Sequence, residues 1–306
     1  MPRALVINSF GGPEVLEVAD LPSPVDVPPG RVRVRVAAAG IQPVDTSIRR
    51  GMAPAGLELA FPITLGNDFA GTIEELGDEV SGWAVGDEVL GFQVLACHAE
   101  EAIVSADQIV AKPPKMPWTV AGSLSASGQT AHIALEALKV APGDTLLVHG
   151  AAGGVGTIAV QLARHLGATV VGTASERNHE HLRSIGAIPV TYGEGLTGRV
   201  REAAPGGVTV AFDAAGGERA LHDSIELGVE PARIGTITAY EEAERLGALG
   251  VRGPRTAARL AELVELWSAG ALRITISRTF RLDEAAEAHR LVEARHLTGK
   301  MVFVND

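Results

Sequence analysis

The chain has 306 residues, of which 46% are hydrophobic and 21% are charged, so it can form a globular protein of two domains of ordinary size. Its formal net charge of −11 disfavours nucleic acid or an anionic membrane as the main partner, because both attract a basic surface. The single cysteine, Cys97, excludes internal disulfides, and the sequence shows neither a signal segment nor an apolar run of about 18–20 residues, so we expect a cytoplasmic protein.

The first hundred residues have the pattern of a β-rich domain. Short alternating or apolar runs, separated by glycine-proline turns, predict strands at residues 4–7, 14–18 and 32–38. Residues 40–51 are typical of a loop that leads into a short helix. Closely spaced glycines between residues 66 and 91 indicate a small, tightly turning barrel.

Helix and strand patterns alternate from about Trp118, after a proline-rich linker at residues 113–117. Strands are predicted at residues 145–149, 169–173, 189–192, 208–213 and 233–238, and helices at residues 127–138, 179–185 and around Leu260–Trp267. This alternation predicts a parallel, doubly wound sheet.

The C-terminal part becomes β-rich again, with strands predicted at residues 274–280 and 300–304 and a helix near 283–292. This return suggests that the tail rejoins the first domain. We therefore expect one domain from residues 1–117 and 262–306, and a second from residues 118–261 that is inserted into it, with a cleft between them.

One glycine-rich turn carries the clearest functional signal. Gly150, Gly153, Gly154 and Gly156 lie between the strand at 145–149 and a helix with apolar residues at helical spacing. Glycines let a pyrophosphate approach without meeting a Cβ, and the free N–H groups of a helix N-terminus favour its negative charge. The strand, turn, helix and following strand together predict dinucleotide binding.

Several segments resemble one family over essentially the whole chain. These are GGPEVLEV, AAGIQPVDTSIRRG, LGNDFAG, VGDEVLGF, SGQTAHIAL, VHGAAGGVGTIAVQLARHLGA, FDAAGG and LTGKMVF. Together they are similar to the medium-chain dehydrogenase/reductase superfamily, and within it to the zinc-independent, quinone oxidoreductase-like branch. The resemblance implies an α/β protein in which a GroES-like β-barrel catalytic domain carries an inserted Rossmann-type domain with a doubly wound parallel sheet.

No metal site is expected. The zinc alcohol dehydrogenases of this superfamily carry a Cys shortly after the glycine that corresponds to Gly40, and a Gly-His-Glu near the one that corresponds to Gly66. Here these regions contain Gln42 and Asn67, and Asp68 alone does not supply the three ligands of a catalytic zinc.

The cofactor is predicted to be NADPH rather than NADH. An NAD enzyme usually has an acidic residue at the end of the second strand, whereas Ser175 and Arg177 follow it here and suit a 2′-phosphate. The resemblance adds Tyr192 as a third contact. The alternative is that Arg177 is a solvated residue at the start of a helix and that Tyr192 merely ends a strand without a binding role. Glu176 does not fit a 2′-phosphate site and is expected to point away from it.

The remaining site residues come from the resemblance. It places the pyrophosphate on the turn and several side chains near the nicotinamide ring, namely Ala152, Gly153, Gly154, Val155 and Gly156 on the turn, and Pro43, Thr130, Ala214, Ala215, Ile237 and Thr238 near the ring. The catalytic candidates are Gln42, Asp45 and Ser47. Asp45 is alternatively a structural anchor of its loop, and the proton can come from water.

These observations predict an NADPH-dependent reductase that transfers a hydride to a quinone or an α,β-unsaturated carbonyl without a metal. The alternatives are an enoyl or ketone reductase of a biosynthetic pathway and, from another class, a non-catalytic NADPH-binding structural protein. The partners expected are a small-molecule substrate and a second copy of the chain. Family members commonly join two sheets at an edge strand, and the strand at residues 233–238 is expected near the sheet edge.

Overall fold

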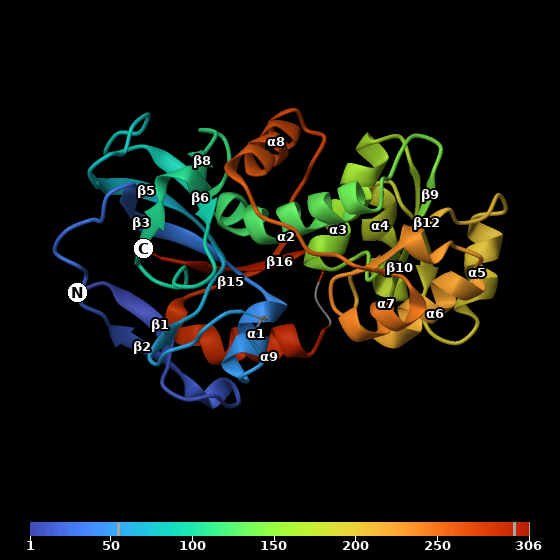
Figure 1. The fold of residues 1–306 in the computed structure, drawn as a ribbon, viewed down its shortest axis with the longest axis horizontal. Coiled ribbons are helices and arrows are strands. Elements are labelled where there is room, and N and C mark those ends of the chain that lie inside the picture. Colours follow the sequence, from blue (N-terminus) through green and yellow to red (C-terminus); the bar gives the residue numbers. More distant parts are fainter. Residues whose placement is uncertain (54–55, 296–297, 306) are drawn as a thin grey trace. The chain divides into compact units, whose positions relative to one another are not determined.

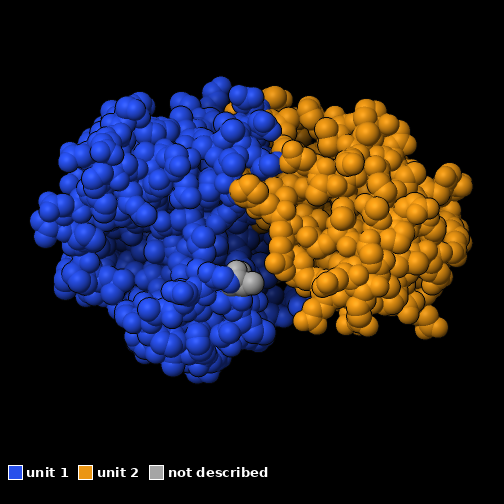
Figure 2. Space-filling model, viewed as in Figure 1, with its two compact units in different colours: residues 1–126, 255–265, 275–306 blue, residues 127–254, 266–274 orange. Residues whose placement is uncertain are grey.

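The structure is a computed structural model that describes residues 1–53, 56–295 and 298–305. It divides into two compact units, coloured separately in Figure 2: unit 1 is Met1–Ala126, Arg255–Glu265 and Thr275–Asp306, and unit 2 is Ser127–Pro254 and Leu266–Ile274. Unit 2 is therefore inserted into unit 1. Two long helices, α2 (Trp118–Ala137) and α8 (Ala257–Ser268), each contribute residues to both units.

Unit 1 is built on a seven-stranded sheet around the long strand β3 (Arg31–Ile41) (Figure 1). The sheet order is β15-β16-β3-β5-β6-β8, and β7 also pairs with β3. The other strands are β5 (Asp68–Leu76), β6 (Glu88–Phe92), β7 (Glu101–Ser105), β8 (Ile109–Ala111), β15 (Ile276–Phe280) and β16 (Lys300–Val304).

A second, three-stranded sheet in unit 1 has the order β2-β1-β4. Its strands, and the short helical elements of this unit, are β1 (Arg3–Ile7), β2 (Leu16–Asp20), β4 (Ile63–Thr64), η1 (Pro13–Val15), η2 (Ala106–Gln108), η5 (Leu282–Glu284), α1 (Pro43–Arg49) and α9 (Ala285–Glu293).

The sequence of β3 explains its central place in unit 1. Val32, Val34 and Val36 alternate along the strand and are buried among the apolar residues of β5 and β6. Arg33 is also nearly buried, and ion pairs to Glu75 and Glu101, at 2.9 and 2.7 Å, offset the cost of removing its charge from water.

Unit 2 contains a six-stranded parallel sheet with the order β11-β10-β9-β12-β13-β14 (Figure 1). Its strands are β9 (Thr145–His149), β10 (Thr169–Ala174), β11 (Ile188–Thr191), β12 (Val210–Asp213), β13 (Ile234–Thr236) and β14 (Leu249–Gly250). The helical elements are α3 (Gly154–His165), η3 (Glu176–Asn178), α4 (His179–Ser184), α5 (Leu196–Ala203), α6 (Glu218–Glu226), η4 (Pro231–Arg233) and α7 (Tyr240–Leu246).

The predicted fold class is confirmed: a β-rich domain carries an inserted domain with a doubly wound parallel sheet. Three details differ. Helix α2 begins at Trp118, earlier than the predicted start at residue 127, because Pro117 ends the linker directly before it. Residues 14–18 open as the 3₁₀ turn η1 and only then become β2. The strand predicted at residues 233–238 does not end the sheet, since β14 pairs outside it.

Among the described residues, no helix combines the length and the apolar character needed to cross a membrane.

Candidate functional site

The turn between β9 and α3 is shaped by its glycines. Gly150 has a φ of +73°, a conformation that favours glycine. A Cβ on Gly156 would lie 2.2 Å from the carbonyl oxygen of Gly150, so only glycine lets α3 begin this close to the turn. The buried residues Ile158, Ala159 and Leu162 then hold α3 against the sheet.

The same turn has room for an anion. Gly153 is the N-cap of α3 and makes no side-chain capping bond, and the first N–H groups of any helix lack partners within it. The nearest atom to a Cβ built on Gly153 is the carbonyl oxygen of Gly150, 3.4 Å away, so there is space beside Gly153. The predicted residues Ala152 to Gly156 are therefore contiguous on the turn that begins α3.

The ends of β10 and β11 bring the predicted 2′-phosphate residues to one edge of unit 2. Ala174 and Thr191 are direct partners in the parallel register, so Ser175 and Tyr192 each follow a strand end on the same side. Arg177 and Tyr192 are exposed, the latter at 57%.

Arg199 adds a second cation at this edge, donating to the carbonyl oxygens of Thr191 at 2.9 Å and Tyr192 at 3.4 Å. Sequence reasoning missed it because it lies on α5, for which no functional pattern was visible.

Asp213 organises the ends of β12 and β13. One carboxylate oxygen accepts the backbone N–H groups of Ala215 and Gly216, at 3.0 and 3.1 Å, and the other accepts the hydroxyls of Thr236 and Thr238, at 2.8 and 3.2 Å. Asp213 is 1% exposed, so these bonds replace water as its partners.

These bonds hold in place four predicted ring-contact residues, Ala214, Ala215, Ile237 and Thr238. Of the other two, Thr130 lies on the unit 2 part of α2, and Pro43 is the first residue of α1 in unit 1.

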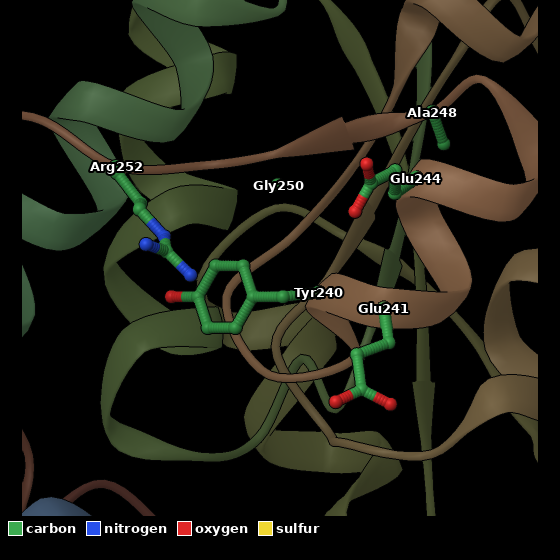
Figure 3. A pocket seen from close by; sticks show the side chains of 6 residues that line it. All are labelled: Tyr240, Glu241, Glu244, Ala248, Gly250 and Arg252. Atoms are coloured by element: carbon green, nitrogen blue, oxygen red, sulfur yellow. The ribbon is translucent and has the colours of Figure 1, made fainter. Parts of the chain in front are cut away.

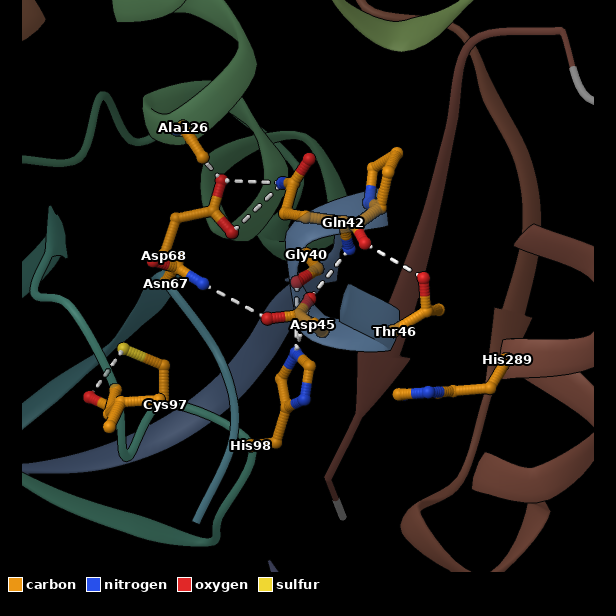
Figure 4. Close-up of polar contacts among 12 residues, drawn as sticks. Gly40, Gln42, Asp45, Thr46, Asn67, Asp68, Cys97, His98, Ala126 and His289 are labelled. Carbon is orange, nitrogen blue, oxygen red and sulfur yellow. Dashed lines mark hydrogen bonds and ion pairs between the residues drawn. The ribbon is translucent and has the colours of Figure 1, made fainter. Parts of the chain in front are cut away.

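In unit 1, the three catalytic candidates lie on α1 or directly before it, and Figure 4 shows two of them, Gln42 and Asp45. Gln42 is the N-cap, and its backbone N–H donates to Asp45 at 2.7 Å. Asn67 also donates to Asp45, at 3.0 Å, and His98 Nε2 lies 3.8 Å from the same carboxyl. Asp45 is fully buried, so its contacts are those of a loop anchor. Ser47 is half-buried, and its hydroxyl donates to the carbonyl oxygen of Pro43 at 3.3 Å.

Two glycines, Gly40 and Gly66, allow the residues of this cluster to pack closely together. A Cβ on Gly40 would lie 2.6 Å from a carboxylate oxygen of Asp68, and one on Gly66 would lie 2.4 Å from the backbone nitrogen of His98. Gly66 also has a φ of +105°. His98 Nε2 donates to the carbonyl oxygen of Gly40 at 3.0 Å.

Burial dominates the electrostatics of the cluster. It raises the pKa of Asp45, although His98 and the backbone N–H of Gln42 act in the opposite direction. It lowers the pKa of Lys300, which Asp68 and Asp45 oppose. Burial also raises the pKa of the Cys97 thiol, which fits a packed, unreactive side chain.

Two cations in this region were missed from the sequence. Lys300, on β16, donates to the side-chain oxygen of Gln42 at 2.6 Å. Arg255 donates to the carbonyl oxygens of Asn67 and Gln93, at 2.8 and 2.9 Å. Both lie far from their partners along the chain, where no local pattern reveals the contact.

The residues at the metal-ligand positions of the zinc enzymes are engaged in these hydrogen bonds. Gln42 accepts from the ammonium of Lys300, and Asn67 donates to Asp45. Across residues 1–53, 56–295 and 298–305, no group of three His, Cys, Asp or Glu side chains is arranged to hold a metal ion.

A separate pocket of about 470 Å³ lies beside α7 and β14 (Figure 3). The guanidinium of Arg252 lies over the ring of Tyr240, 4.3 Å from its centroid. None of the predicted site residues lines this pocket, whose walls also include Glu241 and Glu244.

Comparison with known proteins agrees with this architecture. Residues 28–128 match the family "Alcohol dehydrogenase GroES-like domain", and residues 185–303 match "Zinc-binding dehydrogenase". A quinone oxidoreductase of Pseudomonas aeruginosa is 31% identical, over 99% of this chain and all of the relative. A 2-haloacrylate reductase of a Burkholderia species is 33% identical, over 99% of each chain.

The chain belongs to the medium-chain dehydrogenase/reductase family. A solved structure of the mycobacterial protein Rv1454c in complex with NADPH superimposes with a TM-score of 0.87 at 28% identity, over the full length of both chains. The predicted likeness to quinone oxidoreductases is thereby confirmed, and this member of the family is an NAD(P)-dependent oxidoreductase.

Proposed function

We propose that the protein is an NADPH-dependent reductase that transfers a hydride to a quinone or an α,β-unsaturated carbonyl without a metal ion. The observation that carries this proposal is the hydrogen bonding of Gln42 and Asn67. A metal ion at Gln42 would lie beside the ammonium of Lys300, so these residues do not fit one.

Within the part of the chain that the structure describes, no side chains form a metal ligand set, and this limits the class of acceptor. Reduction of an isolated ketone develops a full negative charge on one oxygen, which a zinc ion or a strong acid must stabilise. A quinone or enone spreads that charge over a conjugated system, so hydrogen bonds suffice. The names of the relatives fit this class, since a 2-haloacrylate is also a conjugated, electron-poor alkene.

The choice of NADPH rests on the edge of unit 2 that follows β10 and β11. Ser175 and Arg177 follow β10 where an NAD enzyme carries an acid. Tyr192 follows the neighbouring strand β11, and Arg199 on α5 donates to the carbonyl oxygens of Thr191 and Tyr192 there. Hydroxyl and guanidinium groups are the natural partners of a 2′-phosphate. When bound, NADPH supplies the hydride.

The protein's own residues bind the cofactor and the substrate and orient them relative to each other. In the proposal the turn at Ala152–Gly156 holds the pyrophosphate, while Asp213 fixes the loops at Ala214–Ala215 and Ile237–Thr238 beside the ring. Pro43 and Thr130 complete the ring contacts. Gln42 donates a hydrogen bond to the substrate, Asp45 anchors the loop that carries Gln42, Ser47 adds a hydroxyl nearby, and water gives the proton.

The test is an oxidation assay with NADPH and NADH against a panel of quinones, enones and simple ketones. We expect conjugated acceptors to be reduced, with NADPH preferred. Arg177→Ala should weaken NADPH binding by about 1–3 kcal/mol, the cost of a lost charge-assisted contact, and leave NADH unchanged. Equal losses for both cofactors would contradict the 2′-phosphate site, and faster turnover of ketones would contradict the reaction class. NADPH binding without any turnover would favour the non-catalytic alternative.

We also propose that the chain forms a homodimer in the cytoplasm through the β14 edge of the unit 2 sheet. A strand at a sheet edge has unpaired backbone groups that a second copy can satisfy. Light scattering at micromolar concentration should give twice the chain mass of 31.7 kDa; a monomer mass would contradict the proposal.

A further inference from the structure

The side-chain amide of Gln42 is held at both ends by groups of opposite charge. The ammonium of Lys300 can only donate, and it meets Oε1 at 2.6 Å. The carboxylate of Asp68 accepts from Nε2, at 3.3 Å to each of its oxygens, and also accepts the backbone N–H of Ala126 at 3.0 Å. The identity of the two partners therefore fixes which end of the amide is oxygen and which is nitrogen.

The sheet of unit 1 brings these residues together. In the antiparallel pair of β16 and β3, Met301 lies opposite Ile41, so Lys300 and Gln42 are neighbours across the strands. Asp68 begins β5, the strand on the other side of β3. Gln42, Asp68 and Lys300 are 5%, 0% and 4% exposed, so water does little to screen their charges (Figure 4 shows Gln42 and Asp68).

The two contacts of the amide differ in strength. The bond from Lys300 is short and charge-assisted, whereas the bonds to Asp68 are longer than ordinary N–H···O bonds. An ammonium on Oε1 draws electron density from the amide and makes its N–H hydrogens stronger donors. An N–H group of this amide is therefore a stronger donor to an oxygen that gains negative charge.

We propose that Lys300 is a positioning residue for the reduction. It holds the amide of Gln42 in a single orientation. It also polarises that amide, so that the amide N–H stabilises the negative charge on the substrate oxygen. This inference rests on the proposed function. In that reaction the hydride adds to the β-carbon of the conjugated acceptor, the π electrons of the C=C bond move toward the carbonyl oxygen, and the resulting enolate takes one proton from water.

The experiment is a double-mutant cycle on Lys300 and Gln42. Lys300→Met removes both the donor and the charge, Lys300→Gln keeps a donor without the charge, and Gln42→Leu removes the amide. We expect Lys300→Met to lower kcat for an enone about 10- to 100-fold, below the loss caused by removing a direct oxyanion donor, and to leave its KM within about threefold. Lys300→Gln should recover part of that loss.

The coupling between the two sites is the decisive result. If Lys300 acts through Gln42, the double variant Lys300→Met/Gln42→Leu should be no slower than Gln42→Leu alone. The proposal is overturned if the loss of kcat in the double variant equals the product of the losses in the two single variants. It is also overturned if Lys300→Met has the kcat of the wild type. The dissociation constant of NADPH, measured by fluorescence titration, should be the same in all variants, and a shared loss of cofactor binding would point instead to a structural role.

Two controls keep the outcome unambiguous. If thermal unfolding shows that Lys300→Met is not folded, Lys300→Met/Asp68→Asn replaces it, because it removes the positive and negative charges together. A wild-type protein that reduces no acceptor in the panel overturns the proposed function and this role with it. If the wild-type protein reduces an acceptor and the Lys300→Met variant reduces it with the same kcat, only the role of Lys300 is overturned.

Discussion

Alanine at Gly156 and at Gly153 should separate the folding of the dinucleotide turn from its binding. A Cβ on Gly156 would lie 2.2 Å from the carbonyl oxygen of Gly150 and 2.8 Å from the Cα of Ala151. Ordinary contact begins at 3.4 Å, and both neighbours are backbone atoms, so α3 must shift by about 1 Å. Overpacking of this kind costs about 3 kcal/mol at its upper end, and the better helix propensity of alanine offsets about 1 kcal/mol.

The net destabilisation of Gly156→Ala is therefore about 2 kcal/mol, which lowers the unfolding midpoint by about 4–8 °C. Gly153→Ala is the matched control. Gly153 has φ −74° and ψ 174°, which any residue adopts, and its nearest neighbour is 3.4 Å from the new methyl group. Its midpoint should stay within about 2 °C, because surface substitutions of this kind change stability by less than about 0.5 kcal/mol.

The methyl group of Gly153→Ala lies at the N-terminus of α3, where the proposed pyrophosphate approaches, so NADPH affinity should fall at least about tenfold. Thermal unfolding by circular dichroism and fluorescence titration with NADPH measure the two effects. A Gly156→Ala protein as stable as the wild type would refute the packing argument. A Gly153→Ala protein with unchanged affinity would show that the cofactor binds elsewhere.

Other expectations can be checked with the same methods. Activity should survive dialysis against a chelator, and a stoichiometric zinc ion found by elemental analysis would contradict the metal-free proposal. Asp213→Ala should destabilise the protein by about 3 kcal/mol or more, since it leaves buried N–H and hydroxyl groups without their acceptor, whereas Asp213→Asn keeps part of this bonding; equal midpoints for the two would refute the account. Burial, with His98 and Arg49 nearby, lowers the pKa of His289 to about 3. The unfolded state therefore takes up a proton below about pH 6.5 and the folded state does not, so stability should fall by about 2 kcal/mol between pH 7 and pH 5 and by less in His289→Gln.

Local patterns made the architecture predictable. The glycine turn is specified within seven residues, because a Cβ on Gly153 or Gly156 would approach the carbonyl oxygen of Gly150 in the same turn. The strand at Lys300–Val304 was also predicted at its observed bounds, because a short apolar run that ends at polar residues is a typical strand pattern. Strand β14 has only two residues and no periodicity, so it could not be seen.

The chemistry of the candidate site was less accessible to sequence reasoning. Gln42 was identified as a position, but its partner Lys300 is 258 residues away, and only the pairing of β16 with β3 makes them neighbours. Asp213 sits within a segment that suggested the family, yet two of its four hydrogen bonds come from Thr236 at the end of the next strand and from Thr238 just after it. Predictions of side-chain function fail where the partners are set by strand order rather than by spacing.

The insertion of unit 2 also determines the order in which the sheet of unit 1 can form during synthesis. Residues 127–254 leave the ribosome between β3 and β16, and at about 5–20 residues per second the interval between Gln42 and Lys300 lasts about 13–50 s. Throughout that time the stretch of β3 from Ala38 to Ile41 lacks the neighbour it has in the folded protein. The nascent first domain therefore carries an open strand edge, a natural point for chaperone binding or for misassociation, until β16 closes it.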